Sequence, residues 1–170
     1  FMSLIIMISI TSVLQIFMPF FIYFIAYGFT NDPIKYDLAI NFSRITSPYI
    51  LLISLSSIGI AILNSLGRYF ASSFGPVIFN AVLVFILILP INNISSIGYL
   101  LSFGVTFSGI IQFLLIFYFL SKSGYKLNLR KPKNLNLINK FSTIARPQII
   151  TGLAIQANIV LSGIIASFVE

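Results

Sequence analysis

Residues 69–121 read YFASSFGPVIFNAVLVFILILPINNISSIGYLLSFGVTFSGIIQFLLIFYFLS, a run without one charged side chain. A helix needs about 20 mostly apolar residues to cross a hydrocarbon core about 30 Å thick, so this run is too long for one span. It contains one turn-like cluster, Pro90-Ile91-Asn92-Asn93. We therefore predict two membrane spans here, at about 72–90 and 97–120.

The chain outside this run repeats the pattern. Residues 1–31, 45–67 and 147–169 are also uncharged, and they predict further spans at about 4–27, 48–66 and 146–168. The apolar residues are continuous, as in 114–120, whereas a membrane β-strand would alternate apolar and polar residues. The sequence therefore predicts an all-α membrane protein, a polytopic bundle with five spans.

Composition narrows the class of protein further. Hydrophobic residues make up 58% of the chain and charged residues 8%, against about 25% charged residues in soluble domains. The net charge of +7 comes largely from one loop, so we expect no nucleic acid partner. The chain has no Cys and no His, which removes thiol chemistry and the commonest metal ligand. We expect no metal and no cofactor.

The basic residues predict the orientation in the membrane. Loop 121–144 and its edge carry Lys122, Lys126, Arg130, Lys131, Lys133, Lys140 and Arg146, and the short loop 67–71 carries Arg68. With alternating spans these two loops lie on one side, which the positive-inside rule places in the cytoplasm. On the other side, Lys35 and Arg44 in 28–47 are balanced by Asp32 and Asp37.

Two stretches between spans predict surface helices. Asp32 and Pro33 form a good helix start, and the apolar face that follows predicts an interfacial helix leading into the second span. A simple connection between the two spans is the alternative role of this helix. Residues 134–144, inside the basic loop 122–145, predict an amphipathic helix beside the membrane. Such a helix can hold anionic lipid headgroups, although topology setting and surface anchoring explain its charges without specific lipid recognition.

Small and amide side chains within the spans predict a packed bundle with a polar interior. Small residues spaced four apart let helices approach closely: Ser57, Ala61 and Ser65; Gly98 and Ser102; Gly104 and Ser108. The amides are Gln15, Gln112, Gln148, Gln156, Asn80 and Asn158. Pro19, Pro76 and Pro147 predict bends.

No enzyme is predicted, and no catalytic residue. The only acids, Asp32, Asp37 and Glu170, lie at predicted membrane borders. The serines have no activating base nearby in the pattern, and no glycine-rich phosphate loop followed by Lys-Ser/Thr is present.

Three strings carry a family resemblance: Arg44-Ile45-Thr46-Ser47-Pro48-Tyr49, then Asn64-Ser65-Leu66-Gly67-Arg68-Tyr69-Phe70, then Gly75-Pro76-Val77-Ile78-Phe79-Asn80. They resemble the MurJ (MviN) family of lipid II flippases, within the multidrug, oligosaccharidyl-lipid and polysaccharide (MOP) exporters. The tail, with Gln156-Ala157-Asn158-Ile159 and Ile165-Ala166-Ser167-Phe168, is similar to that family's seventh span. The similarity runs over nearly the whole chain.

The resemblance implies that the chain is a fragment covering spans three to seven of about fourteen, and the start at Phe1 inside an apolar run fits a fragment. Residues 1–121 would carry four spans of the N-terminal lobe, 122–145 the cytoplasmic loop, and 146–170 the first span of the second lobe. The implied function is flipping of the lipid-linked peptidoglycan precursor across the bacterial inner membrane by alternating access, for cell-wall synthesis.

The resemblance assigns few functional residues of the family to positions in this chain. The family's cavity arginines lie in spans one, two and eight, which have no counterpart here. Arg68 is the nearest candidate for substrate binding, because a guanidinium suits a diphosphate; a topology signal and headgroup anchor is its alternative role. Some members carry an acidic residue, associated with sodium, where this chain has Ser162. The driving force is therefore open between Na⁺ and the membrane potential, worth about 2.3 kcal/mol per charge per 100 mV.

Two alternative functions remain. A related exporter of drugs or polysaccharide-linked lipids would share the fold, with other charges in the absent spans. A non-transporting membrane scaffold would have no basic cavity in the full protein. The predicted spans, with their scattered polar residues, fit either alternative. The sequence strings that resemble the MurJ family favour the flippase.

Overall fold

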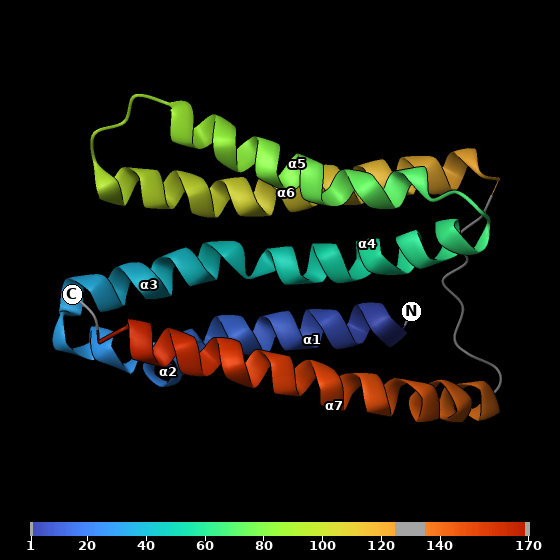
Figure 1. The fold of residues 1–170 in the computed structure, drawn as a ribbon, viewed down its shortest axis with the longest axis horizontal. Coiled ribbons are helices and arrows are strands. Elements are labelled where there is room, and N and C mark those ends of the chain that lie inside the picture. The colour runs from blue at the N-terminus through green and yellow to red at the C-terminus, as the bar shows by residue number, and fades with distance from the viewer. Residues whose placement is uncertain (1, 125–134, 169–170) are drawn as a thin grey trace.

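The computed structural model describes residues 2–124 and 135–168, which form helices and short connections (Figure 1). The elements are α1 (Met2–Ile16), α2 (Met18–Ile25), the 3-10 helix η1 (Tyr27–Asn31), α3 (Pro33–Thr46), α4 (Pro48–Ser65), α5 (Phe70–Ile88), α6 (Ile94–Lys122) and α7 (Leu135–Ala166). The long helices run roughly along the longest axis in alternating directions. The all-α prediction is confirmed.

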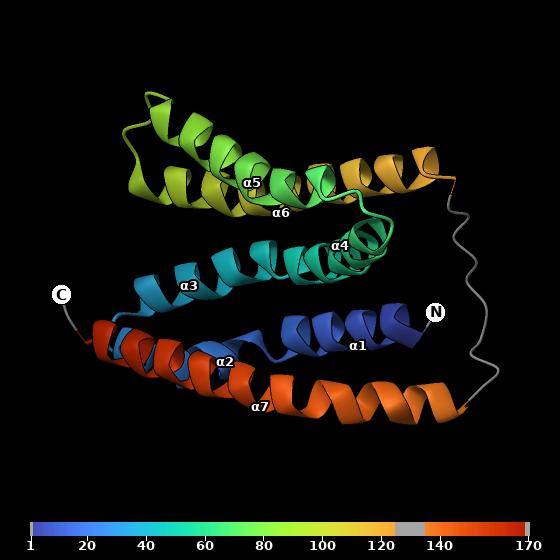
Figure 2. The ribbon, with the colours of Figure 1, turned by 45° about the vertical axis from the view of Figure 1, so that its right-hand side comes forward.

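The central helix is α6, which packs most extensively against α4 and α5. Its 29 residues extend about 44 Å, and its buried side is built largely from small residues: Ser102, Gly104, Ser108 and Gly109, followed by Gln112, Ile116 and Leu120. Where α4, α5 and α6 meet, Leu63, Ala71, Ile116 and Leu120 form a buried apolar cluster. Helix α7 lies on the opposite side of the molecule from α5 and contacts α2 (Figure 2).

The structure places some of the predicted small residues in the helix interfaces and leaves others exposed. Ser102, Gly104 and Ser108 are buried on α6, as predicted. Gly104 lies against the end of the Ile86 side chain of α5, and its missing side chain allows the two helices to approach closely. The prediction was wrong for Ser57, Ala61 and Ser65, which are exposed. Helix α4 instead turns Ser56, Gly59 and Leu63 inward. The reason is the partner, because Ile116 fills the space above Gly59. Each residue turns a helix by about 100°, so shifts of one or two residues place the inward side chains on a different face.

The first predicted span, 4–27, is not one straight helix. Its two halves, α1 and α2, meet at a bend of 75°. Pro19 lies in the first turn of α2, where it has no N–H for the carbonyl of Gln15 and its ring crowds the preceding turn. The bend brings Met18 and Ile22 against Ile40 of α3 in a second buried apolar cluster.

The helix predicted after Asp32 forms, and it continues almost directly into α4. The Asp32 carboxylate accepts hydrogen bonds from the N–H groups of Ile34 and Lys35, at 3.0 and 3.2 Å, which confirms the predicted start. Helix α3 packs against α2 and α6, and the rings of Phe42 and Tyr99 meet edge to face at 4.9 Å. It is therefore part of the bundle and not a separate helix on its surface.

Two predicted boundaries can be compared with the helix ends. Residues 89–93 separate α5 from α6 as predicted, and Asn93 caps α6 by accepting from the N–H groups of Ser95 and Ser96. At the other boundary, α7 runs from Leu135 through Pro147 without interruption. The predicted amphipathic helix 134–144 and the span 146–168 are thus one helix from residue 135 onward, and 125–134 lies outside the described residues.

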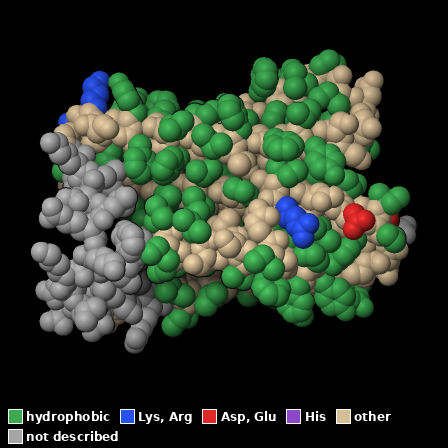
Figure 3. All heavy atoms as spheres, turned by 180° about the vertical axis from the view of Figure 1, so that it is seen from behind, with side chains coloured by type: hydrophobic (Ala, Val, Ile, Leu, Met, Phe, Trp, Pro, Cys, Tyr) green, Lys and Arg blue, Asp and Glu red, His purple; other side chains and the backbone are tan. Residues whose placement is uncertain are grey.

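The described helices suit a membrane. By length and composition, three helical stretches could cross it: Pro33–Ser65, which joins α3 and α4, α6, and Ile149–Ala166 of α7. The bent pair α1–α2 would be a fourth if it is one span, and α5 contains a shorter apolar helix. Hydrophobic and uncharged side chains dominate the face shown in Figure 3. Five spans in a bilayer stay a prediction.

Candidate functional site

The turn between α4 and α5 positions the predicted site residue, Arg68. Helix α4 ends in a pair of backbone hydrogen bonds, from Gly67 N–H to the Asn64 carbonyl at 3.0 Å and from Arg68 N–H to the Leu63 carbonyl at 2.9 Å. Gly67 has a φ of 75°, a left-handed conformation that glycine adopts without strain. This Schellman-type ending reverses the chain sharply and leaves Arg68 at the start of α5.

Arg68 lies in a pocket of about 510 Å³ at this end of the bundle. The pocket is lined by Leu63, Gly67, Arg68, Tyr69, Phe70, Ala71, Phe119 and Lys122. Its base is apolar, because Leu63 and Ala71 belong to the buried cluster between α4, α5 and α6. Two cations contribute to it, Arg68 from the turn and Lys122 from the last turn of α6. We call this the basic pocket.

The pairing of Arg68 with Lys122 was not predicted as a site. The charge count placed their two loops on the same side of the membrane, and that was the available signal. The shared pocket arises because α6 ends beside the beginning of α5, which requires the packing of α5 along α6. Sequence spacing carries no information about that packing.

A second feature is the junction of α3 and α4, where Pro48 interrupts the backbone ladder. Pro48 has no N–H for the carbonyl of Arg44, four residues earlier. The Gln15 side chain of α1 donates to that carbonyl at 2.8 Å and to Ser47 Oγ at 2.7 Å. On the other side, Thr106 Oγ1 of α6 donates to the Ile45 carbonyl at 2.5 Å. Polar side chains from two neighbouring helices thus satisfy backbone that proline leaves open, as an apolar environment requires.

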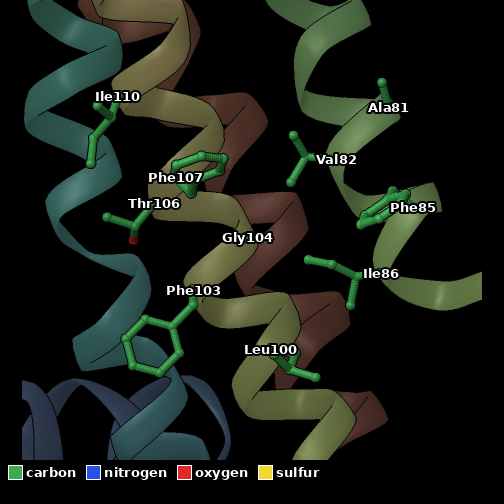
Figure 4. A pocket seen from close by; sticks show the side chains of 10 residues that line it. All are labelled: Ala81, Val82, Phe85, Ile86, Leu100, Phe103, Gly104, Thr106, Phe107 and Ile110. Atoms are coloured by element: carbon green, nitrogen blue, oxygen red, sulfur yellow. The ribbon is translucent and has the colours of Figure 1, made fainter. Parts of the chain in front are cut away.

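A third feature is an apolar groove of about 640 Å³ between α5 and α6 (Figure 4). Val82 and Ile86 point from α5 toward α6, and Phe103 and Phe107 line it from α6. Its one polar side chain, Thr106, already donates to the Ile45 carbonyl. The groove can accommodate hydrocarbon, and none of the described side chains that line it carries a charge that would bind a headgroup.

The other amide side chains predicted to lie inside the bundle differ in burial. Gln112 is buried against Gly75 of α5, whereas Asn80, Gln156 and Asn158 are exposed and the Gln148 side chain lies outside the described residues. The predicted polar interior thus consists of Gln15, Gln112 and buried serines. Ser162 is exposed on α7. Within 2–124 and 135–168, no group of three or more His, Cys, Asp or Glu side chains could hold a metal ion.

Apolar helices long enough to cross a membrane, with Gln112 and several serines buried in the bundle, define an α-helical protein embedded in a membrane. The carbonyl that Pro48 leaves open is satisfied by Gln15 of a neighbouring helix, as an apolar environment requires. The whole chain, residues 1–170, matches the family described as lipid II flippase MurJ. The chain belongs to this family.

Curated relatives agree with the family match. A probable lipid II flippase MurJ of Rhizobium meliloti (strain 1021) is 31% identical over 169 residues, which is 97% of this chain and 32% of the relative. The corresponding proteins of Rickettsia prowazekii (strain Madrid E) and Rhizobium tropici are 32% and 29% identical, over 96% and 95% of this chain and 32% and 31% of their own lengths. The chain spans about a third of the length of these relatives.

Proposed function

We propose that the full-length protein containing this chain flips lipid II across the bacterial inner membrane for peptidoglycan synthesis. The observation that carries the proposal is the family match over all 170 residues. The membrane-type helices support it, and so do relatives whose names describe probable lipid II flippases. The related exporter of drugs or other lipids, and the non-transporting scaffold, are the alternatives to be excluded.

The proposed mechanism is alternating access, in which lobes rock around a central cavity. Bent helices suit such movement, because a bend concentrates the change of backbone angles in a few residues. The chain has one such bend, of 75° between α1 and α2, and the Gln15 side chain connects the helix before it to Ser47 at the junction of α3 and α4. We propose that the bend and this junction move as a unit.

For the substrate, we propose that Arg68 contacts the diphosphate of lipid II at the cytoplasmic surface, before the headgroup enters the cavity. The support is its place in the basic pocket at the end of the bundle.

For the driving force, we propose the membrane potential, because Ser162 offers no carboxylate to a sodium ion at the position where some family members have one. Flipping in proteoliposomes with an imposed potential and no Na⁺ measures this directly.

The test of the function is complementation. The full-length gene is expressed in a bacterium whose own lipid II flippase is depleted, and the surface exposure of lipid II is measured as cells are rescued. Rescue together with restored surface lipid II is the expected result and excludes the scaffold. An exporter of another cargo would leave depleted cells lysing while the protein accumulates normally in their membrane, and that outcome would overturn the proposal.

A further inference from the structure

The basic pocket combines features that a substrate contact by Arg68 alone does not explain. Its two cations come from the α4–α5 turn and from the end of α6, and its walls are largely aromatic and aliphatic. Phe70 and Tyr69 are 68% and 65% exposed beside it. Among the described side chains that line it, those of Arg68, Lys122 and Tyr69 are polar, so the pocket offers few partners to a sugar headgroup.

The first residues of α5 add a third source of positive potential. Tyr69, Phe70 and Ala71 line the pocket, and α5 begins without a side-chain cap. The first N–H groups of a helix lack partners within the helix, and they attract anions. Arg68, Lys122 and this helix start therefore lie around one opening, and none of the described residues that line it is acidic. An anion is the complementary ligand.

We propose that the basic pocket binds the phosphate of an anionic phospholipid of the surrounding membrane, with its acyl chains against Phe70 and Phe119. The phosphate would accept hydrogen bonds from the guanidinium of Arg68 and the ammonium of Lys122. The lipid would hold the α4–α5 turn and the end of α6 at the membrane surface. This ligand is an ordinary membrane lipid, so the inference stands independently of the cargo that the full-length protein moves.

The position of the pocket fits this ligand. The bundle end that carries Arg68 and Lys122 is the end predicted to face the cytoplasm, where anionic lipids attract basic residues. Helix α6, about 44 Å long, exceeds a hydrocarbon core of about 30 Å. Its last turn, with Lys122, can therefore reach headgroup level while its middle remains in hydrocarbon.

The test compares lipids bound to the purified full-length protein in mixed micelles, with fluorescent phosphatidylglycerol and phosphatidylcholine of identical chains as probes. We expect preferential binding of phosphatidylglycerol, weakened about fivefold for each cation removed in Arg68→Gln and Lys122→Gln. The matched control is Lys35→Gln with Arg44→Gln, which removes the same charge from the predicted opposite side and should leave binding unchanged. Thermal unfolding of each variant confirms that the bundle is intact.

A polyprenyl diphosphate serves as the second probe and separates the two lipid sources. Phosphatidylglycerol binding that depends on Arg68 and Lys122 supports the inference, whether or not the protein flips lipid II. Dependence seen with the polyprenyl diphosphate alone would overturn it and assign the pocket to substrate. Equal losses in the control variant, or unchanged binding in the double variant Arg68→Gln/Lys122→Gln, would also overturn it.

Discussion

Gln15 shows how one side chain can stabilise three helices. Its amide donates to the Arg44 carbonyl, which Pro48 leaves open, and to Ser47 Oγ. Replacing Gln15 with Leu keeps the volume and removes both bonds. We expect a loss of about 1–2 kcal/mol in the free energy of unfolding, since hydrogen bonds between membrane helices are worth about 0.6–1.7 kcal/mol each. Thermal unfolding in detergent measures it, and Gln156→Leu, at an exposed amide of α7, is the control.

A residue-scale effect on packing is predicted at Gly59, whose missing side chain makes room for Ile116. A methyl group there would lie 2.5 Å from Cγ2 of Ile116, on a β-branched side chain that cannot rotate away easily. We expect Gly59→Ala to destabilise the protein by about 1–3 kcal/mol through overpacking. Adding Ile116→Ala should recover part of this loss. Gly152→Ala, which meets open space, should have little effect; an equal loss there would contradict the packing argument.

At the scale of the element, the α3–α4 junction combines a lost backbone bond with substitutes from two other helices. Pro48→Ala restores an N–H that can donate to the Arg44 carbonyl. We expect the penalty of Gln15→Leu to shrink by roughly half in the Pro48→Ala background, because one of its two bonds becomes dispensable. The measurement is a double-mutant cycle on thermal unfolding. Strict additivity of the two changes would show that the restored N–H does not replace the Gln15 bond to this carbonyl.

The sequence predicted these elements well where local chemistry determines them. The Asp32 cap, the break at 89–93 and the small buried face of α6 all follow from residues within one or two turns. Features that depend on a partner were missed. Whether Ser57 or Ser56 faces inward depends on Ile116, and the pairing of Arg68 with Lys122 depends on how α5 lies along α6. The 75° bend was signalled by Pro19, but its size depends on the packing of α2 against α3.

At the scale of the molecule, the alternating helices predict which loops share a side of the membrane. The basic pocket brings the α4–α5 turn and the end of α6 to one end of the bundle, whereas the hydrogen bond from Gly28 N–H to Ser167 Oγ, at 3.0 Å, joins η1 to the end of α7. Residues near 28 and 167 should therefore face one side of the membrane, and residues near 67 and 123 the other.

Cysteine labelling tests this arrangement, because the chain contains no Cys of its own. Single cysteines replace Gly67, Ser123, Asn31 or Asn92 in a full-length protein freed of any other cysteines, and intact cells are treated with a membrane-impermeant maleimide. We expect labelling at 31 and 92 from outside, and at 67 and 123 only after the membrane is opened, because the basic loops should remain in the cytoplasm. Labelling of 67 and 123 from outside would invert the orientation, and with it the leaflet proposed for the basic pocket. Labelling of 31 and 92 from opposite sides would contradict α4 and α5 as a pair of full spans.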